Sequence, residues 1–129
     1  GHTLGHIAYY NETALFCGDT LFSCGCGRIF EGTALQMFES IGKIKALNDE
    51  VMIYCAHEYT LANIAFSKLV EPDNLALMKR YQTVKQAREQ HLPSLPVTLK
   101  EERATNPFLR CDHPQVIQSV LEKYPNHPH

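Results

Sequence analysis

Apolar and polar positions divide the chain into a first part with strand-like segments and a second part with helical periodicity. Short runs of β-branched and aromatic residues at 7–10 and 13–17 are separated by Asn11-Glu12. This pattern predicts two strands joined by a tight turn. A continuous apolar run at 51–55 predicts a third strand that is buried on both faces. No later segment shows a convincing strand pattern.

Helical spacing of apolar residues predicts helices in much of the remaining chain. Capping-box sequences begin at Thr33 and Thr98, and Asn106-Pro107 is expected to end the helix that follows Thr98. The predicted helices are 34–47, a helix capped by Thr60, 72–89, a short helix after Thr98, and 114–124. The apolar positions expected to face the core are Leu35, Phe38, Ile41, Ile44, Leu61, Ile64, Ala65, Leu69, Leu77, Tyr81, Val84, Val116, Val120 and Leu121.

Composition favours a folded domain and argues against two kinds of partner. The chain has 129 residues, of which 44% are apolar, and this is enough to build a core. A formal net charge of −2 leaves no basic excess to neutralise phosphates, so no nucleic-acid partner is expected. No apolar run approaches the roughly eighteen residues of a membrane span, so no membrane partner is expected. The expected fold class is α/β up to about residue 59, followed by an all-helical part.

The start of the chain and its cysteines bear on its cellular context. The sequence begins GHTLGH without an initiator methionine, so we expect it to begin inside a larger protein. The first residues show neither the basic n-region nor the apolar h-region of a secretory signal peptide. Five cysteines are an odd number at low density, which favours a reducing compartment. We expect the cytoplasm, with the mitochondrial matrix as the alternative.

A glycine-rich segment follows the second predicted strand. Residues 18–32 contain four of the seven glycines of the chain. This density is too high for the interior of a helix or strand, and it is typical of a loop whose backbone approaches another group closely. The segment is therefore the first candidate for a binding function.

Three polar residues, His2, Asp19 and His57, lie in the opening segment or at the ends of predicted strands. Imidazole and carboxylate groups suit zinc or iron, so the three could form a metal site, although three ligands are marginal for one ion. Taken singly, a loop histidine is more often a surface or hydrogen-bonding residue, and an aspartate after glycine is usually a turn residue. His6 can share a face with His2, but their spacing alone decides nothing.

Two further groups leave alternatives open. Four cysteines could bind structural zinc, but their spacing is unusual for such a site and buried apolar thiols are the better interpretation. These four are Cys17, Cys24, Cys26 and Cys55. Arg28 and Tyr59 would suit an anionic substrate, although on spacing alone an exposed loop charge explains Arg28 better. The residues by themselves indicate a metal-assisted hydrolase or a metal-binding α/β fragment.

Four sequence strings add a family resemblance. GHTLGH, LFCGDTLF, GCGRIFEGT and AHEYT occur in this order and are followed by a helical tail. Together they resemble the glyoxalase II family, the hydroxyacylglutathione hydrolases of the metallo-β-lactamase superfamily, over about residues 1–110. The resemblance implies that residues 1–59 are the second half of an αβ/βα sandwich. It also implies that residues 60–129 are an all-helical glutathione-site domain, incomplete at its C-terminus.

The resemblance further implies a site with two divalent metal ions, with zinc expected first and iron or manganese as alternatives. By this likeness His2 binds one ion, Asp19 bridges both and His57 binds the other, whereas His6 is a supporting residue. Asp19 and His57 would be the catalytic residues. The residues implied to border a glutathione thioester are Arg28, Ile29, Phe30, His57, Glu58 and Tyr59.

The implied reaction is hydrolysis of S-D-lactoylglutathione, a 2-hydroxyacylglutathione, to glutathione and D-lactate in methylglyoxal detoxification. The complete enzyme is expected to be a monomer acting on this small molecule. The family's T-H-x-H-x-D-H motif and its C-terminal Arg-x-x-Lys do not occur here. We therefore expect the isolated chain to hold metal weakly and to lack appreciable thioesterase activity. The alternatives are a persulfide dioxygenase-like enzyme and a pseudoenzyme that binds glutathione conjugates or a protein.

Overall fold

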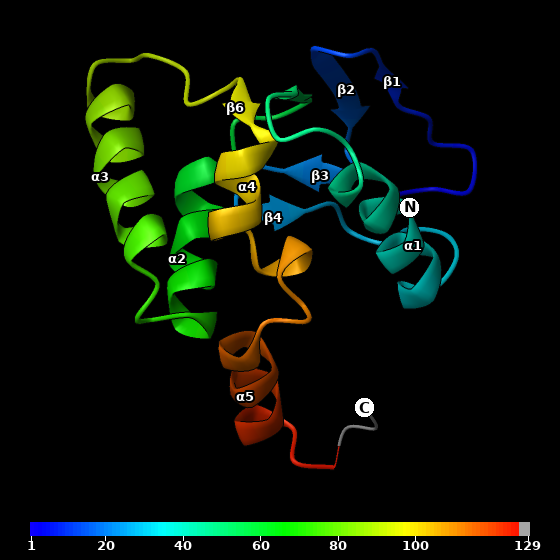
Figure 1. Cartoon of the computed structure of the whole chain (residues 1–129), viewed down its shortest axis with the longest axis vertical. Coiled ribbons are helices and arrows are strands. Elements are labelled where there is room, and N and C mark those ends of the chain that lie inside the picture. The colour runs from blue at the N-terminus through cyan, green and yellow to red at the C-terminus, as the bar shows by residue number, and fades with distance from the viewer. Residues whose placement is uncertain (127–129) are drawn as a thin grey trace.

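The computed structural model describes residues 1–126, so the last three residues of the predicted helical part, 127–129, lie outside the described residues. Strands dominate the beginning of the chain and helices the remainder (Figure 1). The strands are β1 (Tyr9–Tyr10), β2 (Ala14–Gly18), β3 (Leu21–Phe22), β4 (Gly25–Cys26), β5 (Met52–Cys55) and β6 (Val97–Thr98). The helices are α1 (Ala34–Lys45), α2 (Thr60–Val70), α3 (Leu75–Glu89), α4 (Leu99–Thr105), the 3-10 helix η1 (Pro107–Leu109) and α5 (Pro114–Lys123).

The main sheet has the strand order β1-β2-β5-β6. β2 and β5 are parallel, with Leu15 opposite Ile53, and β1 and β6 add antiparallel edges. Parallel neighbours need a long crossover connection, and here the crossover contains the β3–β4 hairpin and α1. This arrangement confirms the predicted α/β class with a helical C-terminal part.

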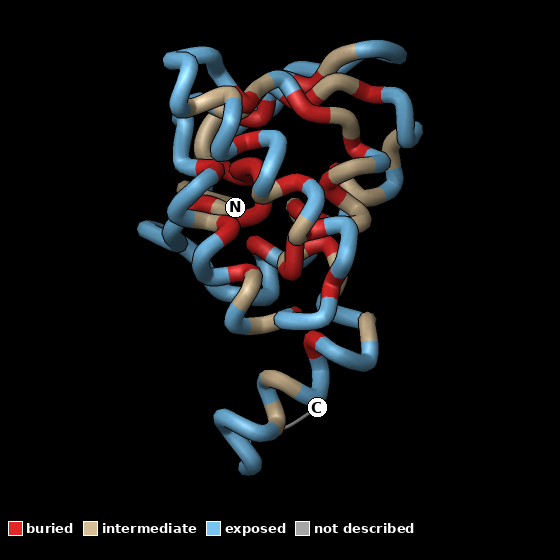
Figure 2. Tube along the Cα trace, turned by 90° about the vertical axis from the view of Figure 1, so that its left-hand side faces the viewer, coloured by how far each residue is buried: buried red, intermediate tan, exposed pale blue. Residues whose placement is uncertain are grey.

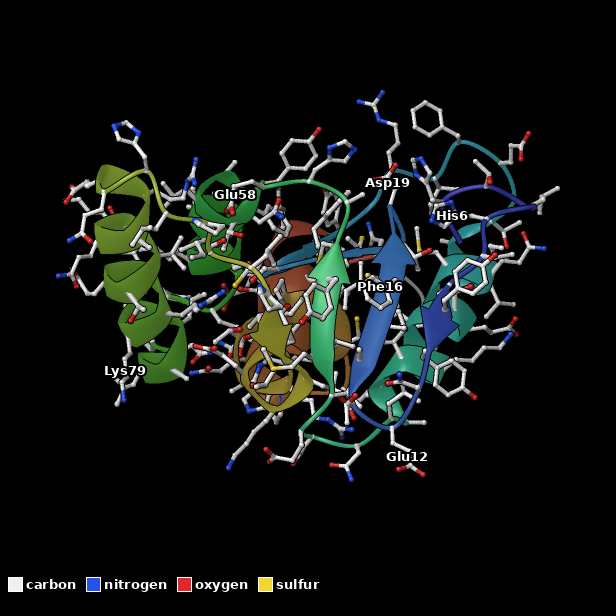
Figure 3. All side chains as sticks on the ribbon, turned by 90° about the horizontal axis from the view of Figure 1, so that it is seen from above. His6, Glu12, Phe16, Asp19, Glu58 and Lys79 are labelled. Carbon is white, nitrogen blue, oxygen red and sulfur yellow. The ribbon has the colours of Figure 1, made fainter. Side chains whose placement is uncertain are left out.

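One prediction about β5 is wrong, because helices cover only one face of the sheet. Ile53 is fully buried, whereas the neighbouring Tyr54 is 39% exposed. Tyr54 stacks instead on Phe16 of β2, with ring centroids 4.9 Å apart. Figure 3 shows Phe16 on the open face of the sheet, with α1 and α4 behind it. The described part of the chain therefore leaves an aromatic sheet face uncovered.

The prediction that no strand follows β5 is also wrong. β6 contains only two residues, too few to show any alternation in the sequence. It is recognised by pairing alone, because Val97 lies opposite Ile53 and Thr98 opposite Met52. A strand of this length has its place determined by the sheet and not by its own pattern.

The covered face of the sheet packs on α1 and forms the main core. Thr33 caps α1 in a complete capping box with Gln36, as predicted. The apolar stripe differs from the prediction, because Leu35 and Phe38 are exposed and Met37 is buried in their place. The buried core residues are Leu15, Cys17, Leu21, Met37, Ile41, Ile44, Val51, Ile53, Val97, Leu99 and Leu109.

Helix α2 starts and packs differently from its prediction. Tyr59 is the N-cap and makes no side-chain cap bond, while the Thr60 hydroxyl lies 2.6 Å from Ser94 Oγ. Ile64 is buried as predicted, but the polar Ser67 is buried as well. The other apolar positions predicted to face inward, Leu61, Ala65 and Leu69, are exposed. The buried side of α2 faces the β3–β4 turn, whose backbone carbonyls need hydrogen-bond donors.

Helix α3 confirms its predicted inward positions. Leu77 and Val84 are buried, and Tyr81 packs against them from a half-buried position. The helix begins at Leu75, later than predicted, because the Asn74 side chain accepts a hydrogen bond from the Leu77 amide and acts as the N-cap.

Helices α4 and α5 complete the described chain. Thr98 caps α4 by accepting a hydrogen bond from the Glu101 amide, and Asn106 ends the helix, as predicted. Asn106 also caps η1, which was not predicted. In α5 only Val116 is buried; Leu121 is half-buried and Val120 is exposed, so the predicted inward face is only partly correct. Figure 2 shows α5 projecting from the body, where most buried segments lie. Among residues 1–126 no helix is both long and apolar enough to cross a membrane.

Candidate metal centre and its flanking loops

The structure brings together the three residues predicted to bind metal. Asp19 directly follows β2 and His57 follows β5, so both lie at the same edge of the sheet, where parallel strands end. Asp19 Oδ1 is 3.2 Å from His57 Nε2, and Asp19 Oδ2 is 3.7 Å from His2 Nε2. The carboxylate therefore stands between the two imidazoles.

The protonation of His2 follows from its neighbours. Its Nδ1 lies 2.7 Å from the carbonyl oxygen of Arg28, which can only accept a hydrogen bond. Nδ1 therefore carries a proton and donates it to this oxygen, and Nε2 faces Asp19. A metal-binding histidine typically has this arrangement, in which one ring nitrogen is held by an outer acceptor and the other is directed at the ion.

His6 has a supporting position and lies outside this cluster. Its Nε2 accepts a hydrogen bond from the Asp19 amide at 3.0 Å, and Figure 3 shows the two residues near the end of β2. Its ring also lies so close to Gly18 that a Cβ atom on Gly18 would sit 2.4 Å from His6 Nε2. His6 thus fixes the backbone from which the Asp19 side chain projects.

The donors at this edge fit a cation chemically but do not complete a site for one. Asp19 Oδ1 is buried and has no hydrogen-bond partner among residues 1–126, as expected for an oxygen that faces a cation. Two imidazole nitrogens and a carboxylate are typical zinc donors. Within residues 1–126, however, no group of three or more His, Cys, Asp or Glu side chains is arranged to hold a metal ion.

The cysteines do not form the alternative zinc site in the part of the chain that the structure describes. Cys24 is fully buried, and its Sγ lies 3.6 Å from Thr105 Oγ1, so it faces the core. Burial raises the pKa of the Cys24 thiol to about 12 and that of Cys26 to about 11. Both thiols are therefore protonated at neutral pH and are poor metal ligands and nucleophiles.

Two aromatic side chains flank the cluster from opposite sides. The exposed Phe30 ring packs edge-on against His2, with centroids 5.0 Å apart, and the Arg28 guanidinium lies 5.7 Å from the same ring. On the other side Tyr59 stacks on His57 with centroids 5.1 Å apart. An aromatic ring with an adjacent cation thus flanks His2, and a second ring flanks His57. The partly exposed Ile29 lies between Arg28 and Phe30 in the chain.

Glu58 does not point toward the cluster. Its Oε2 accepts a hydrogen bond from the Ser94 amide at 2.9 Å, and its Oε1 accepts one from the Ser94 hydroxyl. Burial acts to raise the pKa of Glu58, but the hydrogen bonds from Ser94, together with Thr60 and the charge of Arg88, outweigh burial, so this pKa is lowered. Glu58 is therefore a carboxylate bound to the segment that joins α3 to β6.

Sequence reasoning missed several residues around the site. A Cβ atom on Gly27 would lie 1.7 Å from the carbonyl oxygen of Asp19, so this position requires glycine. The glycine density of 18–32 signalled such an approach without showing its target. Ser94 and the buried Arg80 and Glu102 gave no sequence signal, because their partners are distant along the chain.

Two known families match this chain, one after the other along its sequence. Residues 1–57 match the family described as "Metallo-beta-lactamase superfamily". Residues 58–127 match the family described as "Hydroxyacylglutathione hydrolase C-terminus". The chain thus belongs to the hydroxyacylglutathione hydrolase family, in agreement with the resemblance carried by its sequence strings.

Two curated relatives are named for this family. "Hydroxyacylglutathione hydrolase" of Nitrosomonas eutropha is 56% identical over 127 residues, which are 98% of this chain and 50% of the relative. "Hydroxyacylglutathione hydrolase 2" of Vibrio vulnificus is 56% identical over 126 residues, again 98% of this chain and 50% of the relative. The chain spans about half the length of the curated relatives it matches.

A solved structure described as a metallo-beta-lactamase from Staphylococcus aureus aligns over 91% of this chain and 28% of its own, with 22% identity and a TM-score of 0.44. This likeness bears on neither the site nor the function.

Proposed function

We propose that the protein to which this chain belongs is a thioester hydrolase that converts S-D-lactoylglutathione to glutathione and D-lactate. The observation that carries the proposal is the convergence of His2, Asp19 and His57 at one edge of the sheet. Family membership supports it, because the relatives are named for hydrolysis of hydroxyacylglutathione.

The proposed cofactor is a pair of divalent metal ions, with zinc first and iron or manganese as alternatives. His2, Asp19 and His57 would hold them from this chain, with Asp19 between the two imidazoles. When bound, such ions supply Lewis-acid activation of the thioester carbonyl and of water. Arg28 O keeps the His2 proton on Nδ1, so that Nε2 is free to act as a ligand.

The proposed substrate contacts lie on the two flanking loops. Arg28 and Tyr59 would bind carboxylates and peptide oxygens of glutathione, because guanidinium and phenol groups are hydrogen-bond donors. Ile29 and Phe30 would cover the apolar part of the tripeptide and exclude water. Both loops end beside Asp19, so a thioester held between them would have its carbonyl near the proposed metal ligands.

We further propose the organisation and setting of the protein. Residues 1–59 would form the second half of an αβ/βα sandwich, and the open aromatic face around Phe16 and Tyr54 supports this assignment, because such a face is normally covered. Residues 60–129 would form the helical glutathione-site domain. A monomer in the cytoplasm is proposed, and the five cysteines, all without a disulfide, fit a reducing compartment.

The proposal is tested by measuring metal binding and turnover separately. We expect zinc titration of the 129-residue chain to show weak binding that Asp19→Ala abolishes, because this removes the central donor. His91→Ala is the matched control, because His91 is an exposed histidine in a loop outside the site. Zinc binding that is unchanged by Asp19→Ala would contradict the proposed ligands.

Turnover is measured on the protein isolated from its natural source, with S-D-lactoylglutathione as substrate. We expect thioesterase activity from a species well above 14.6 kDa, and no appreciable activity from the 129-residue chain. Oxygen consumption with glutathione persulfide would instead support a persulfide dioxygenase. Binding of glutathione conjugates by a native 14.6 kDa species without turnover would support a pseudoenzyme.

A further inference from the structure

We infer that Glu58 is a positioning residue that holds the His57–Tyr59 segment in place. It does so through a buried network of hydrogen bonds, which also holds the β3–β4 hairpin between Asp19 and Arg28. The network runs from Glu58 through four further residues. In order, they are Ser94, Arg80, Ser23 and Glu102. The inference rests on the proposed function, since it concerns the placement of a proposed metal ligand.

The first link joins the His57–Tyr59 segment to Ser94. Both carboxylate oxygens of Glu58 accept hydrogen bonds from Ser94, one from its amide and one from its hydroxyl. The Ser94 hydroxyl also lies 2.6 Å from Thr60 Oγ1 at the start of α2. Residues on both sides of Tyr59 are therefore attached to the same serine, and no oxygen of Glu58 is left without a partner.

The second link crosses from Ser94 to the β3–β4 hairpin. Arg80, on α3, donates from Nη2 to the Ser94 carbonyl oxygen at 2.9 Å and to the Ser23 hydroxyl at 3.3 Å. The Ser23 hydroxyl donates in turn to Glu102 Oε1 at 2.7 Å. Arg80, Ser23 and Glu102 are all buried, so these bonds act in a low-dielectric interior where they are strong and costly to lose.

The third link fixes the hairpin turn to the helices. Glu102 accepts from the Cys24 amide at 3.0 Å, and Asn106 donates to the carbonyl oxygens of Phe22 and Gly25. Ser67 of α2 donates to the Cys24 carbonyl oxygen at 2.9 Å. The hairpin turn is thus held from α2 and from α4 and its C-terminal end.

The β3–β4 hairpin connects these buried hydrogen bonds to the proposed site. Asp19 precedes its first strand and Gly27-Arg28 follow its second strand, and the Gly27 amide donates to the Thr20 carbonyl oxygen at 3.2 Å. The Arg28 carbonyl oxygen then holds His2. The contacts form a closed circuit in which each of the two loops is tied to the same buried groups.

This circuit explains why Glu58 follows His57 in a site for a metal and an anionic substrate. A free carboxylate there would compete with Asp19 for cations and repel substrate carboxylates. Bound to Ser94, the same carboxylate sets the direction in which the segment leaves β5. The stacked His57 and Tyr59 rings are the part of the site that this direction determines.

Nuclear magnetic resonance of the 14.6 kDa chain tests the inference without metal. The His57 and Tyr59 rings are stacked with an interplanar angle of 20°, so their ring protons carry mutual ring-current shifts. We expect Glu58→Ala to reduce these shifts and to raise the mobility of the 56–60 backbone. Glu58→Gln, whose side-chain oxygen can accept from the Ser94 amide and whose NH2 group can donate to the Ser94 hydroxyl, should retain most of both signals.

Glu89→Ala is the matched control, because Glu89 is an exposed glutamate that pairs with Lys85 on the surface of α3. It should leave the ring shifts of His57 and Tyr59 unchanged. Zinc affinity provides a second measurement, and we expect a loss of about tenfold in Glu58→Ala, the lower end for residues that orient metal ligands.

Unchanged ring shifts and backbone mobility in Glu58→Ala would overturn the inference. If that variant does not fold, Ser94→Ala takes its place, and unchanged signals in Ser94→Ala would overturn it equally. Altered ring shifts in a chain that binds no zinc even as wild type would support the positioning role and count against the proposed metal site. The two proposals therefore fail by different measurements.

Discussion

Two hairpin turns in this protein provide hydrogen-bond partners for their backbone groups in opposite ways. In the β1–β2 turn the Asn11 side chain accepts hydrogen bonds from the amides of Thr13 and Ala14 at 2.9 and 2.8 Å. The groups of this turn come from four successive residues, of which Asn11, Glu12 and Thr13 are exposed and Ala14 is half-buried. In the β3–β4 turn Ser23 and Cys24 are buried, and their partners come from α2, α3 and α4.

The difference shows which part of the molecule depends on tertiary structure. An asparagine that bonds to the backbone two or three residues ahead forms a turn by itself. Cys24, by contrast, has a φ of 58°, a left-handed conformation that non-glycine residues rarely adopt. Such a conformation persists where surrounding contacts determine it, and here those contacts are the buried bonds to Glu102 and Ser67.

The largest expected effect comes from removing the main acceptor of the buried turn. Glu102→Ala leaves the Ser23 hydroxyl, the Cys24 amide and the Asn106 amide without their partner inside the core. We expect a loss of about 4 kcal/mol in the free energy of unfolding, because each buried donor left without an acceptor costs about 1–3 kcal/mol. Urea unfolding followed by circular dichroism measures this loss.

The adjacent Glu101 provides the control for that measurement. Its side chain is 41% exposed and lies 3.7 Å from Arg80 Nη1. Glu101→Ala should change the free energy of unfolding by less than about 1 kcal/mol, because the separation of 3.7 Å is long and the Glu101 carboxylate is exposed to water. Equal losses in the two variants would show that the buried turn does not depend on Glu102.

The next effect tests how tightly the exit of the buried hairpin is packed. In Gly27→Ala the new methyl group would meet the Asp19 carbonyl oxygen at 1.7 Å, so the backbone must move. We expect a loss of about 2 kcal/mol in the free energy of unfolding, as in other overpacked sites. The same urea titration provides the measurement.

Gly42→Ala is the matched control for Gly27→Ala. Gly42 lies inside α1, and a Cβ atom there would meet nothing within 4 Å. Because alanine is the better helix former, Gly42→Ala should stabilise the chain by about 0.5–1 kcal/mol. A stabilising Gly27→Ala would contradict the close approach of the two loops.

A smaller effect is expected at the self-contained turn. Asn11→Ala removes an acceptor of two backbone amides and of the Thr13 hydroxyl, all of which can then bond to water. We expect a loss of about 1 kcal/mol by urea unfolding. Glu12→Ala, at the next exposed position, should stay within about 0.5 kcal/mol of the wild type. A loss as large as that of Glu102→Ala would remove the contrast between the turns.

The smallest expected effect is a dependence on pH that belongs to Glu102. Burial raises the pKa of Glu102 above its ordinary value of 4.5, despite the hydrogen bonds from Ser23, Asn106 and the Cys24 amide and the nearby charge of Arg80. The folded chain therefore retains a proton that the unfolded chain loses. The contribution of Glu102 to stability is fully present below pH 4.5 and falls as pH rises through the folded pKa.

Glu102→Gln removes this titration and keeps an oxygen that can accept from the Cys24 amide. The difference in free energy of unfolding between wild type and Glu102→Gln should be most favourable to wild type below pH 4.5 and should decrease with rising pH. Urea unfolding at a series of pH values measures it. A difference that grows with pH would mean that Glu102 is charged in the folded state.

Much of the fold could be predicted because its signals are local. The α1 capping box, the Asn106 helix end and the inward positions Leu77 and Val84 each depend on residues within one or two helical turns. The family resemblance rested likewise on contiguous strings, and the family comparison confirms it. Such signals depend on local backbone preferences and on the spacing of apolar residues. Both are set by neighbouring residues and need no distant partner.

The sequence by itself thus determined the family, the α/β-then-helical order and the candidate residues His2, Asp19 and His57. Only the tertiary structure decided that Tyr54 is exposed, that β6 exists, and that Glu58 faces Ser94. The physical reason is that burial and hydrogen bonding of these groups depend on partners far away along the chain. Ser23 and Glu102 are a clear case, because neither has a reason to be buried until the other is present.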